Sequence, residues 1–438
     1  MRAARSDVSS ISASTAHGPE PLIASRRLVW FVGLSHAINH FVMLIFPAVL
    51  LLVQQEFGLG YARLGLLANV ALLFYGVAAL PAGMLADRLG GERILGVWLL
   101  GGSFACLGIG LSKGTLGLGI GLALLGLVAS LHHPAGSGVL VTLRNLRGLD
   151  VGRAFGRVGV MGNMGLASSP VLAAAVGAGW GWRAAFVVAA LPGLLLYLVV
   201  WRLGLLSSHP LPRTAPHQDE PRLTFWRELT FPVLLLFAFE TLMGFIFQGF
   251  STFLPAHLAE RAGIPGITAA QVARGGSLAS LALLFGGLGH LLAGRLMASH
   301  HREAIFLMTT GMTALCLVGM GIAIGFPLVV FSTVFALTHF AISTMSNTFI
   351  ASHTPAHLGG TAFGITFTLS IGVGSLASSS MGLVGERFGL SAIFLALGVI
   401  AVAGVLLVAW FGSTVGAWSR QVGLPAGSPL PGSHTKGR

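Results

Sequence analysis

Long apolar runs separated by short polar segments recur along the whole chain. A helix that crosses the hydrocarbon core of a bilayer needs about 20 mostly apolar residues. The runs of that length fall at 28–53, 62–84, 94–112, 115–140, 155–178 and 183–205, and again at 231–254, 270–297, 304–324, 327–350, 361–385 and 389–411. The pattern predicts an all-α membrane protein with twelve transmembrane helices, six on each side of a polar segment at 206–230.

The composition supports a bilayer as the solvent of this chain. Apolar residues make up 54% of the 438 residues and charged residues only 9%, whereas soluble domains carry about a quarter charged residues. The 62 glycines are typical of membrane helices that pack closely through small side chains. Cys106 and Cys316 both lie inside apolar runs, so the sequence predicts neither a disulfide framework nor a thiolate metal site.

The net charge of +12 bears on topology rather than on nucleic-acid binding, because the basic residues form no continuous patch or stripe. With the N-terminus inside the cell, the basic residues of the outer segments are Arg63, Lys113, Arg183, Arg261, Arg274 and Arg387. All other Lys and Arg residues then face the cytoplasm, as the positive-inside rule requires. Residues 1–27 contain no apolar core, so no cleavable signal peptide is expected. We expect a multi-pass protein of a bacterial inner (cell) membrane, with both termini cytoplasmic.

The two halves of the chain resemble each other in sequence. The segments GRAFGRVGVMGNMGLASS from Gly152 and GTAFGITFTLSIGVGSLA from Gly360 share Gly, Ala, Phe and Gly, and then small residues, at one constant offset. The same offset places Pro47 on Pro255. Many transporters are built from two related halves, although chance alignment of Gly-rich segments is the alternative. The repeat predicts two pseudo-symmetric six-helix bundles, 28–205 and 231–412, with cytoplasmic tails at 1–27 and 413–438 and a cytoplasmic linker at 206–230.

The segment GMLADRLGGERIL, residues 83–95, connects the second and third runs. Its glycines allow a very short connection between two helices, and its charged side chains can pair with helix ends or with each other. This segment resembles the signature between the second and third helices of the major facilitator superfamily, and the resemblance covers roughly residues 28–412. It implies the fold of that family and a gating role for Asp87, Arg88 and Arg93, since the family's Asp and Arg lock the cytoplasmic side by contacting the other half.

Three further segments bear on the resemblance. In the second half the equivalent of the signature, GRLMASHHRE from Gly294, has Ala298 at the position of the acid. The first-helix segment GLSHAINHFVMLIFPAVL and the fourth-helix segment LHHPAGSG resemble the fosmidomycin-resistance group of efflux proteins. The chain departs from that group at Ala135, which follows Pro134 where the group carries an acid. The resemblance implies efflux of a small organic solute.

Glu240 is the one acid, of 13, that lies deep inside an apolar run. It stands about nine residues, and hence roughly 14 Å, from the start of its helix. Ionisable groups inside membrane spans are costly and are usually functional. We therefore expect Glu240 to be the proton-coupling residue, and a neutral carboxyl hydrogen-bonded to backbone or to a hydroxyl is the alternative.

Histidine and amide side chains gather in the first and fourth helices. The first helix carries polar residues three and four positions apart, which places them on one face, and the His pair of LHHPAGSG lies at a comparable depth. In the superfamily the first, fourth, seventh and tenth helices line a central cavity, so the resemblance implies that these residues meet the solute there. The candidate solute-binding residues are His36, Asn39, His40, His132, His133, Gln248 and His339. Histidines that are satisfied by neighbouring helices are the alternative for each.

Aromatic and polar side chains of two later helices could add to such a cavity. In the seventh helix these are Phe237, Phe239, Met243, Phe245, Phe247 and Phe250, which also suit lipid contact or helix packing. In the tenth helix they are Ser343, Thr344, Ser346 and Asn347, which also suit hydrogen bonding between helices. Neither set identifies a solute.

These features predict a secondary active transporter that moves a small organic solute by alternating access, with proton-coupled antiport and efflux as the favoured mode. No catalytic residues, no resident metal and no cofactor beyond a coupling proton are expected, and the expected state is a monomer in the lipid bilayer. No Gly-Lys-Ser loop is present for an ATP-driven pump. The alternatives are a transporter-like receptor or assembly protein without turnover, and a metal-ion transporter that uses the membrane histidines.

Overall fold

The computed structural model describes residues 19–147, 151–206, 230–263, 269–297, 299, 301–354 and 359–421. Every regular element in these residues is helical. The helices of the N-terminal half are α1 (Pro19–Met43), α2 (Ile45–Phe57), α3 (Tyr61–Val77), α4 (Ala79–Leu89), α5 (Gly91–Gly110), α6 (Thr115–Ala129), α7 (His132–Arg147), α8 (Val151–Trp180) and α9 (Trp182–Arg202). Those of the C-terminal half are α11 (Phe231–Arg261), α12 (Ala269–Leu296), α13 (Arg302–Ile322), α14 (Gly325–His353), α15 (Gly359–Phe367), the π-helix η2 (Thr368–Val373), α16 (Leu376–Phe388) and α17 (Leu390–Gln421).

Twelve spans among the described residues are long and apolar enough to cross a membrane, and each coincides with a predicted apolar run. Single helices form eight of them, and the other four join consecutive helices. Two helices extend into the predicted tails, because α1 begins at Pro19 and α17 ends at Gln421. Hydropathy detects only the part of a helix that is embedded in lipid. The same helix can continue beyond the bilayer, because its backbone hydrogen bonds are made within the helix itself. The predicted linker 206–230 lies almost wholly outside the described residues.

Four of the predicted runs are interrupted helices rather than continuous ones, and two of these interruptions bear on the boundary between the halves. In the first span the chain leaves the helix at Leu44, between α1 and α2. Pro47 explains this break, since it has no N–H to donate to the carbonyl four residues earlier. In the eleventh span η2 separates α15 from α16, and single π-turns of this kind are frequent at functional sites. Both interruptions lie where the two halves meet.

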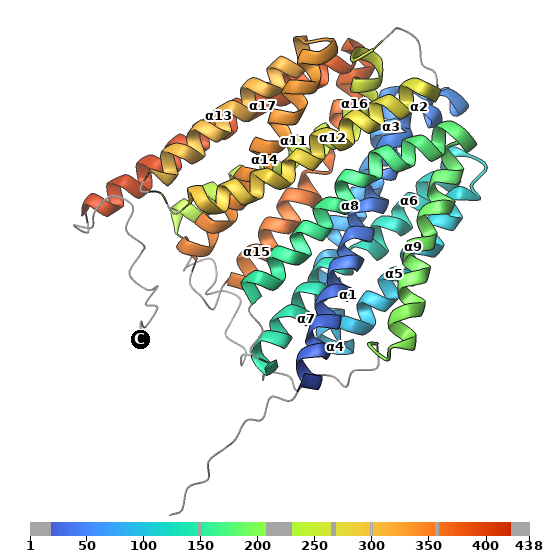
Figure 1. The fold of residues 1–438 in the computed structure, drawn as a ribbon. Helices are drawn as coiled ribbons and strands as arrows, with labels where there is room; N and C mark the ends of the chain where they lie inside the picture. Colours follow the sequence, from blue (N-terminus) through green and yellow to red (C-terminus); the bar gives the residue numbers. More distant parts are fainter. Residues whose placement is uncertain are drawn as a thin grey trace, which may run out of the picture.

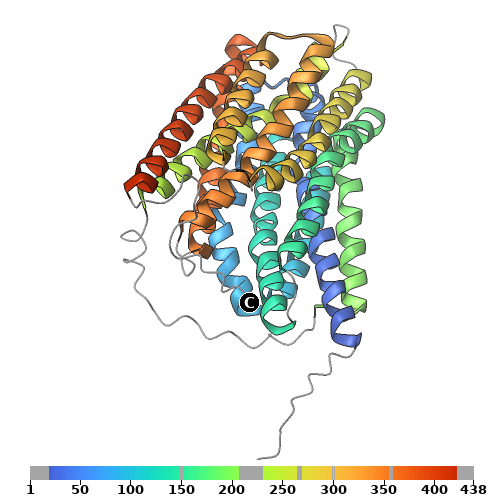
Figure 2. The same ribbon diagram turned by 60° about the vertical axis from the view of Figure 1, so that its left-hand side comes forward.

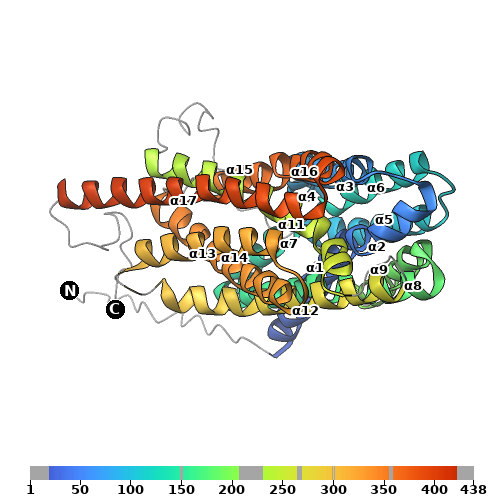
Figure 3. The same ribbon diagram turned by 90° about the horizontal axis from the view of Figure 1, so that it is seen from above.

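The helices are arranged as two six-helix bundles that lie side by side (Figure 3). Helices α1–α9 form one bundle and α11–α17 the other (Figure 2). Along the boundary α8 packs against α12 (Figure 1), and α3 packs against α16. The halves are therefore joined along two helix pairs, which leaves the space between these pairs for a cavity.

One end of the molecule, which we call the closed end, holds hydrogen bonds between the halves. It includes the start of α3, the end of α8 and the end of α11. The Tyr61 hydroxyl donates to the Glu260 carboxylate, and the Ala62 backbone N–H donates to Glu386 Oε2 at 2.8 Å. Further towards the middle, a Cβ atom on Gly65 would lie only 2.0 Å from the Ser378 carbonyl oxygen. The backbones of α3 and α16 therefore touch, which seals this end.

Candidate functional site

A cavity of about 410 Å³ lies between the two halves. The N-terminal half lines it with residues of α1, α2, α3, α6, α7 and α8, and the C-terminal half with residues of α11, α14, α15 and η2. The interruptions of the first and the eleventh span both contribute, since Leu44 and Ile371 are part of the wall. A cavity of this volume that is mostly apolar with a few polar groups suits a small organic molecule.

The structure brings some of the candidate solute-binding residues to this cavity and leaves others away from it. His40, His133, Gln248 and His339 line it, together with Glu240. The remaining candidates, His36, Asn39 and His132, do not, because their rings or amides point into contacts between helices of the N-terminal half. Helical spacing placed these residues on the right helices, but only packing decides which face turns inward.

Glu240 lies in α11 with 7% of its surface exposed, at the cavity wall. Its Oε1 atom has no hydrogen-bond partner among the described residues, and the Ser346 hydroxyl of α14 is the polar group beside it. Met243 and Phe247, one and two turns further along α11, are its apolar companions in the wall. A buried carboxyl with an open acceptor can exchange a proton or a hydrogen bond with whatever enters the cavity.

Asn39 has a structural place in the first span. Its side-chain N–H donates to the Ala129 carbonyl at 3.0 Å, and its Oδ1 accepts the Tyr75 hydroxyl at 3.0 Å. Asn39 is fully buried, so both of its contacts fix neighbouring helices rather than a solute. Tyr75 is held by this bond with its ring in the cavity wall.

Aromatic rings from both halves meet across the cavity. The Phe367 ring of α15 lies 5.0 Å from the His133 ring and 6.0 Å from the Tyr75 ring, both of which belong to the other half. On the opposite wall Phe247 stacks on His339 with ring centroids 5.0 Å apart. Sequence reasoning missed Tyr75 and Phe367, because nothing in an apolar run distinguishes a ring in a cavity from one facing lipid.

The aromatic face predicted for the seventh helix is divided by the fold. Met243 and Phe247 line the cavity. Phe237, Phe239 and Phe250 are buried in the packing of the C-terminal half. Of the tenth-helix polar residues, Ser343 and Asn347 line the cavity, whereas Thr344 Oγ1 is 2.7 Å from His290 Nδ1.

The predicted gating residues lie at the end of the molecule opposite the closed end. Arg88 is in the last turn of α4 and Arg93 in the first turn of α5, and both side chains are exposed. The side chain of Asp87 lies outside the described residues, and so does Ala298 at the corresponding place in the second half. The gating role therefore stays a prediction.

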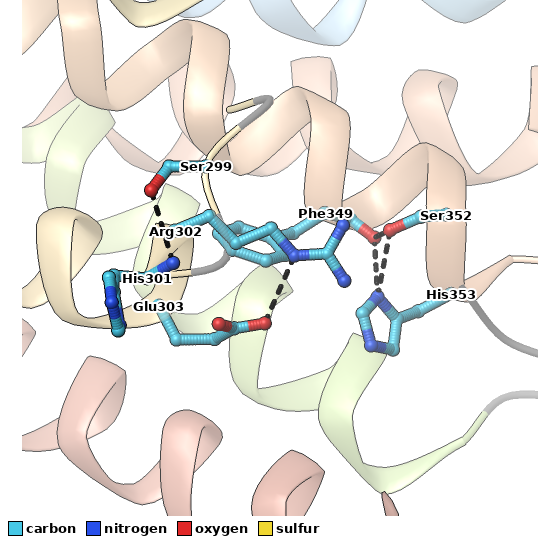
Figure 4. A network of polar contacts seen from close by, with 7 residues as sticks. All are labelled: Ser299, His301, Arg302, Glu303, Phe349, Ser352 and His353. Atoms are coloured by element: carbon cyan, nitrogen blue, oxygen red, sulfur yellow. Dashed lines mark hydrogen bonds and ion pairs between the residues drawn. The ribbon is translucent and has the colours of Figure 1, made fainter. Parts of the chain in front are cut away.

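The end of the C-terminal half near that second segment carries a polar network (Figure 4). Arg302 Nε donates to Glu303 Oε1 at 3.1 Å, and its guanidinium lies 5.6 Å from the centre of the Phe349 ring. His353 Nδ1 is 2.8 Å from the Phe349 carbonyl oxygen and Ser352 Oγ is 3.0 Å from it. Of these contacts, the one between Arg302 and Phe349 joins the start of α13 to the end of α14, and the others lie within a single helix.

Comparison with known proteins finds similarity to transporters. A family model described as Major Facilitator Superfamily matches residues 29–379. The probable L-galactonate transporter of Escherichia coli (strain K12) is 26% identical over 62% of this chain and 66% of its own length. The uncharacterized MFS-type transporter YfnC of Bacillus subtilis (strain 168) is 23% identical over 86% of this chain and 90% of its own length. The multidrug resistance protein MdtG of Erwinia billingiae (strain Eb661) is 34% identical over 31% of this chain and 33% of its own length.

Solved structures share the fold. A bacterial homologue of the human lysosomal transporter Spinster, in an inward-facing and occupied conformation, superposes with a TM-score of 0.71, at 17% identity, over 89% of this chain and 97% of that one. The nucleoside transporter NupG superposes with a TM-score of 0.68, at 12% identity, over 89% and 98%. At such identities the likeness extends to the fold and not to the solute.

Proposed function

Because the chain belongs to the major facilitator superfamily, we propose that it is a secondary active transporter that exports a small organic solute by alternating access, coupled to protons. The observation that carries the proposal is the cavity of about 410 Å³ between two halves that are hydrogen-bonded to each other at one end. Alternating access requires a central site and a closure that can pass from one end to the other. Both features are built from residues of the two halves.

The positive-inside distribution supports an orientation for this cycle. The basic residues assigned to the outer segments, Arg63, Lys113, Arg183, Arg261, Arg274 and Arg387, lie at the closed end. The closed end then faces outward, and the structure corresponds to an inward-facing state of a bacterial inner-membrane protein. The termini and the linker 206–230 lie on the cytoplasmic side, where Asp87, Arg88 and Arg93 close the other end in the second state.

Glu240 is the proposed coupling residue. Its carboxyl lies at the cavity wall among apolar side chains and has an oxygen without a protein partner. Such surroundings favour the neutral form, and hydration of the cavity on opening favours release of the proton. A carboxyl whose proton affinity changes with the conformation couples proton movement to the movement of the solute.

The lining of the cavity favours a neutral or cationic solute with an apolar part. The described lining residues include no Lys or Arg, and they include several aromatic rings from both halves. The names of the relatives point to two solute classes, a sugar acid and drugs. A sugar acid carries a carboxylate, which would face imidazoles and Glu240 in the described lining. Aromatic rings with one carboxyl suit an apolar molecule with an amine or hydroxyl groups.

A flux measurement in proteoliposomes tests the proposal. A ligand screen by thermal shift on the purified protein first supplies a solute, since a ligand that binds only the folded state raises its thermal stability. With an imposed pH gradient, the wild type should accumulate that solute and Glu240→Gln should not, while its exchange of labelled for unlabelled solute continues. Glu303→Gln, which removes a carboxyl outside the cavity, serves as the matched control and should accumulate solute as the wild type does.

The outcomes of this measurement separate the alternatives. Equal accumulation by the wild type and Glu240→Gln would remove Glu240 as the coupling group. A ligand that stabilises the wild type but is never carried across the membrane would instead support a transporter-like receptor without turnover.

A further inference from the structure

Four imidazoles meet between α1 and α7, beside the central cavity. One ring nitrogen from each of His36, His132 and His133 lies within 4.8 Å of the corresponding atoms of the other two. The His36 ring stacks on the His132 ring with centroids 5.1 Å apart. His40 Nε2 is 2.9 Å from His36 Nε2, which brings a fourth imidazole within reach of the same point.

Two of the rings are held in place by hydrogen bonds to other helices or to a neighbouring side chain. His36 Nδ1 is 2.9 Å from the Val158 carbonyl oxygen, and because a carbonyl only accepts, Nδ1 carries the hydrogen and Nε2 keeps its lone pair. His132 Nδ1 is 3.1 Å from Ser35 Oγ, which can donate or accept, and this contact leaves its Nε2 available to a ligand. Histidines that bind metals almost always have their second nitrogen held by a carbonyl, a carboxylate or a hydroxyl-type partner.

The surroundings of the rings provide room for an ion. A small cavity of about 110 Å³ is lined by His36, His132 and His133. The His36 ring packs on the backbone of α8 at Gly162, where a Cβ atom would lie 2.4 Å from the ring. His133 also lines the central cavity, so the cluster stands between the small cavity and the central one.

We propose that His36, His132 and His133 form a binding site for a divalent transition-metal ion, with His40 as a fourth ligand. Neutral imidazoles suit Zn²⁺, Co²⁺, Ni²⁺ and Cu²⁺, whereas Ca²⁺ and Mg²⁺ prefer oxygen ligands. Tetrahedral bonds of about 2.0–2.1 Å place ligand nitrogens roughly 3.3 Å apart. The ring nitrogens are at most 4.8 Å apart. Side-chain rotations that shorten these nitrogen–nitrogen distances by about 1.5 Å produce the tetrahedral geometry. This site goes beyond the proposed solute transport and does not depend on it.

Metal binding to the full-length chain, purified in detergent with a tag that contains no histidine, tests the proposal. Zn²⁺ is titrated in equilibrium dialysis, and Co²⁺ supplies an absorption spectrum that reports tetrahedral nitrogen coordination. The wild type should bind one Zn²⁺ per chain more tightly than the background from the tail histidines. His36→Gln combined with His132→Gln should weaken that site at least tenfold, as the loss of two ligands requires.

Two further variants separate a metal site from a structural role. His290→Gln removes a half-buried imidazole outside the cluster, which is hydrogen-bonded to Thr344, and it should bind Zn²⁺ as the wild type does. His132→Cys keeps a zinc ligand at the same place and should retain binding, whereas His132→Asn should not. Equal affinity and stoichiometry in the wild type and the double variant would overturn the proposal.

A measurement on the wild type alone covers the case in which the double variant does not fold. X-ray absorption of the chain loaded with one equivalent of Zn²⁺ should show three or four imidazole nitrogens at about 2.0–2.1 Å. An oxygen-dominated shell would overturn the proposal. Solute flux is measured separately, so loss of the metal site with flux intact leaves the proposed transport standing, and the reverse result leaves the metal site standing.

Discussion

Replacement of Gly65 by alanine should open the closed end. Gly65 in α3 faces the backbone of α16 in the other half, and a Cβ atom there would lie 2.0 Å from the Ser378 carbonyl oxygen and 3.2 Å from the Gly382 Cα atom. Both neighbours are backbone atoms, so they cannot turn away as a flexible side chain would. The methyl group therefore strains the state in which α3 and α16 touch, and leaves the outward-open state unstrained.

The size of the effect follows from the cost of overpacking. Extra methyl groups in a well-packed interface typically cost about 1–3 kcal/mol. A change of that size in the free-energy difference between two conformations shifts their ratio roughly 5- to 150-fold. A protein that is almost wholly inward-facing should therefore show a measurable outward-open fraction in Gly65→Ala.

Spin labels on the two halves at the closed end can measure this shift. Lys113 lies between α5 and α6, and Phe326 begins α14 with 78% of its surface exposed. Lys113→Cys and Phe326→Cys are introduced after Cys106 and Cys316, both buried, have been replaced by alanine. The distance distribution between the labels should gain a longer component in Gly65→Ala.

A matched glycine controls for helix propensity. Gly108 lies in α5, and a Cβ atom on it would meet nothing within 4 Å. Gly108→Ala should leave the distance distribution unchanged. If Gly65→Ala and Gly108→Ala gave the same distribution as the parent, then either the contact with Ser378 does not hold the closed end or the halves do not part there, and the reasoning would fail.

Three further predictions concern the two ends and the topology. Tyr61→Phe removes the hydrogen bond to the Glu260 carboxylate and should raise the outward-open fraction by less than Gly65→Ala does, because an exposed hydrogen bond contributes about 1 kcal/mol or less; the same spin-label pair measures it. Asp87→Asn should weaken closure of the opposite end through lost charge-assisted hydrogen bonds and slow transport, and unchanged flux in proteoliposomes would contradict the gating role. A cysteine at Ser208 should react with an impermeant thiol reagent only from the cytoplasmic side, and labelling from the outer side would contradict the assigned orientation.

Much of the fold could be predicted from the sequence because the bilayer imposes a simple rule. Each span must be a helix of about 20 apolar residues, since unpaired backbone groups are too costly in lipid. All twelve predicted runs coincide with spans of the structure. Glu240 could be singled out for the same reason, because an ionisable residue inside an apolar run is costly in lipid. The structure places it at the cavity wall.

Other features depended on contacts between residues far apart in the sequence. Nothing in the fourth helix distinguishes His132, which is 2% exposed and lines the small cavity, from His133, which lines both cavities. One residue turns a helix by about 100°, and the neighbours of the helix decide which face is inside. Nothing in the sequence singled out Phe367 either. In the structure it is the last residue of α15, directly before η2, and its ring lies beside His133 of the other half.

The sequence by itself determined that this chain lies in a membrane, how often it crosses, that its halves are related and which acid is out of place, because hydropathy, period and charge are local properties. Only the tertiary structure decided which end is closed, since that depends on whether the backbones at Gly65 and Ser378 touch. It also decided which imidazoles converge, because the positions of His36 and His132 relative to each other are set by the packing of α1 against α7. Helix packing is a cooperative property of the whole bundle, and no single segment encodes it.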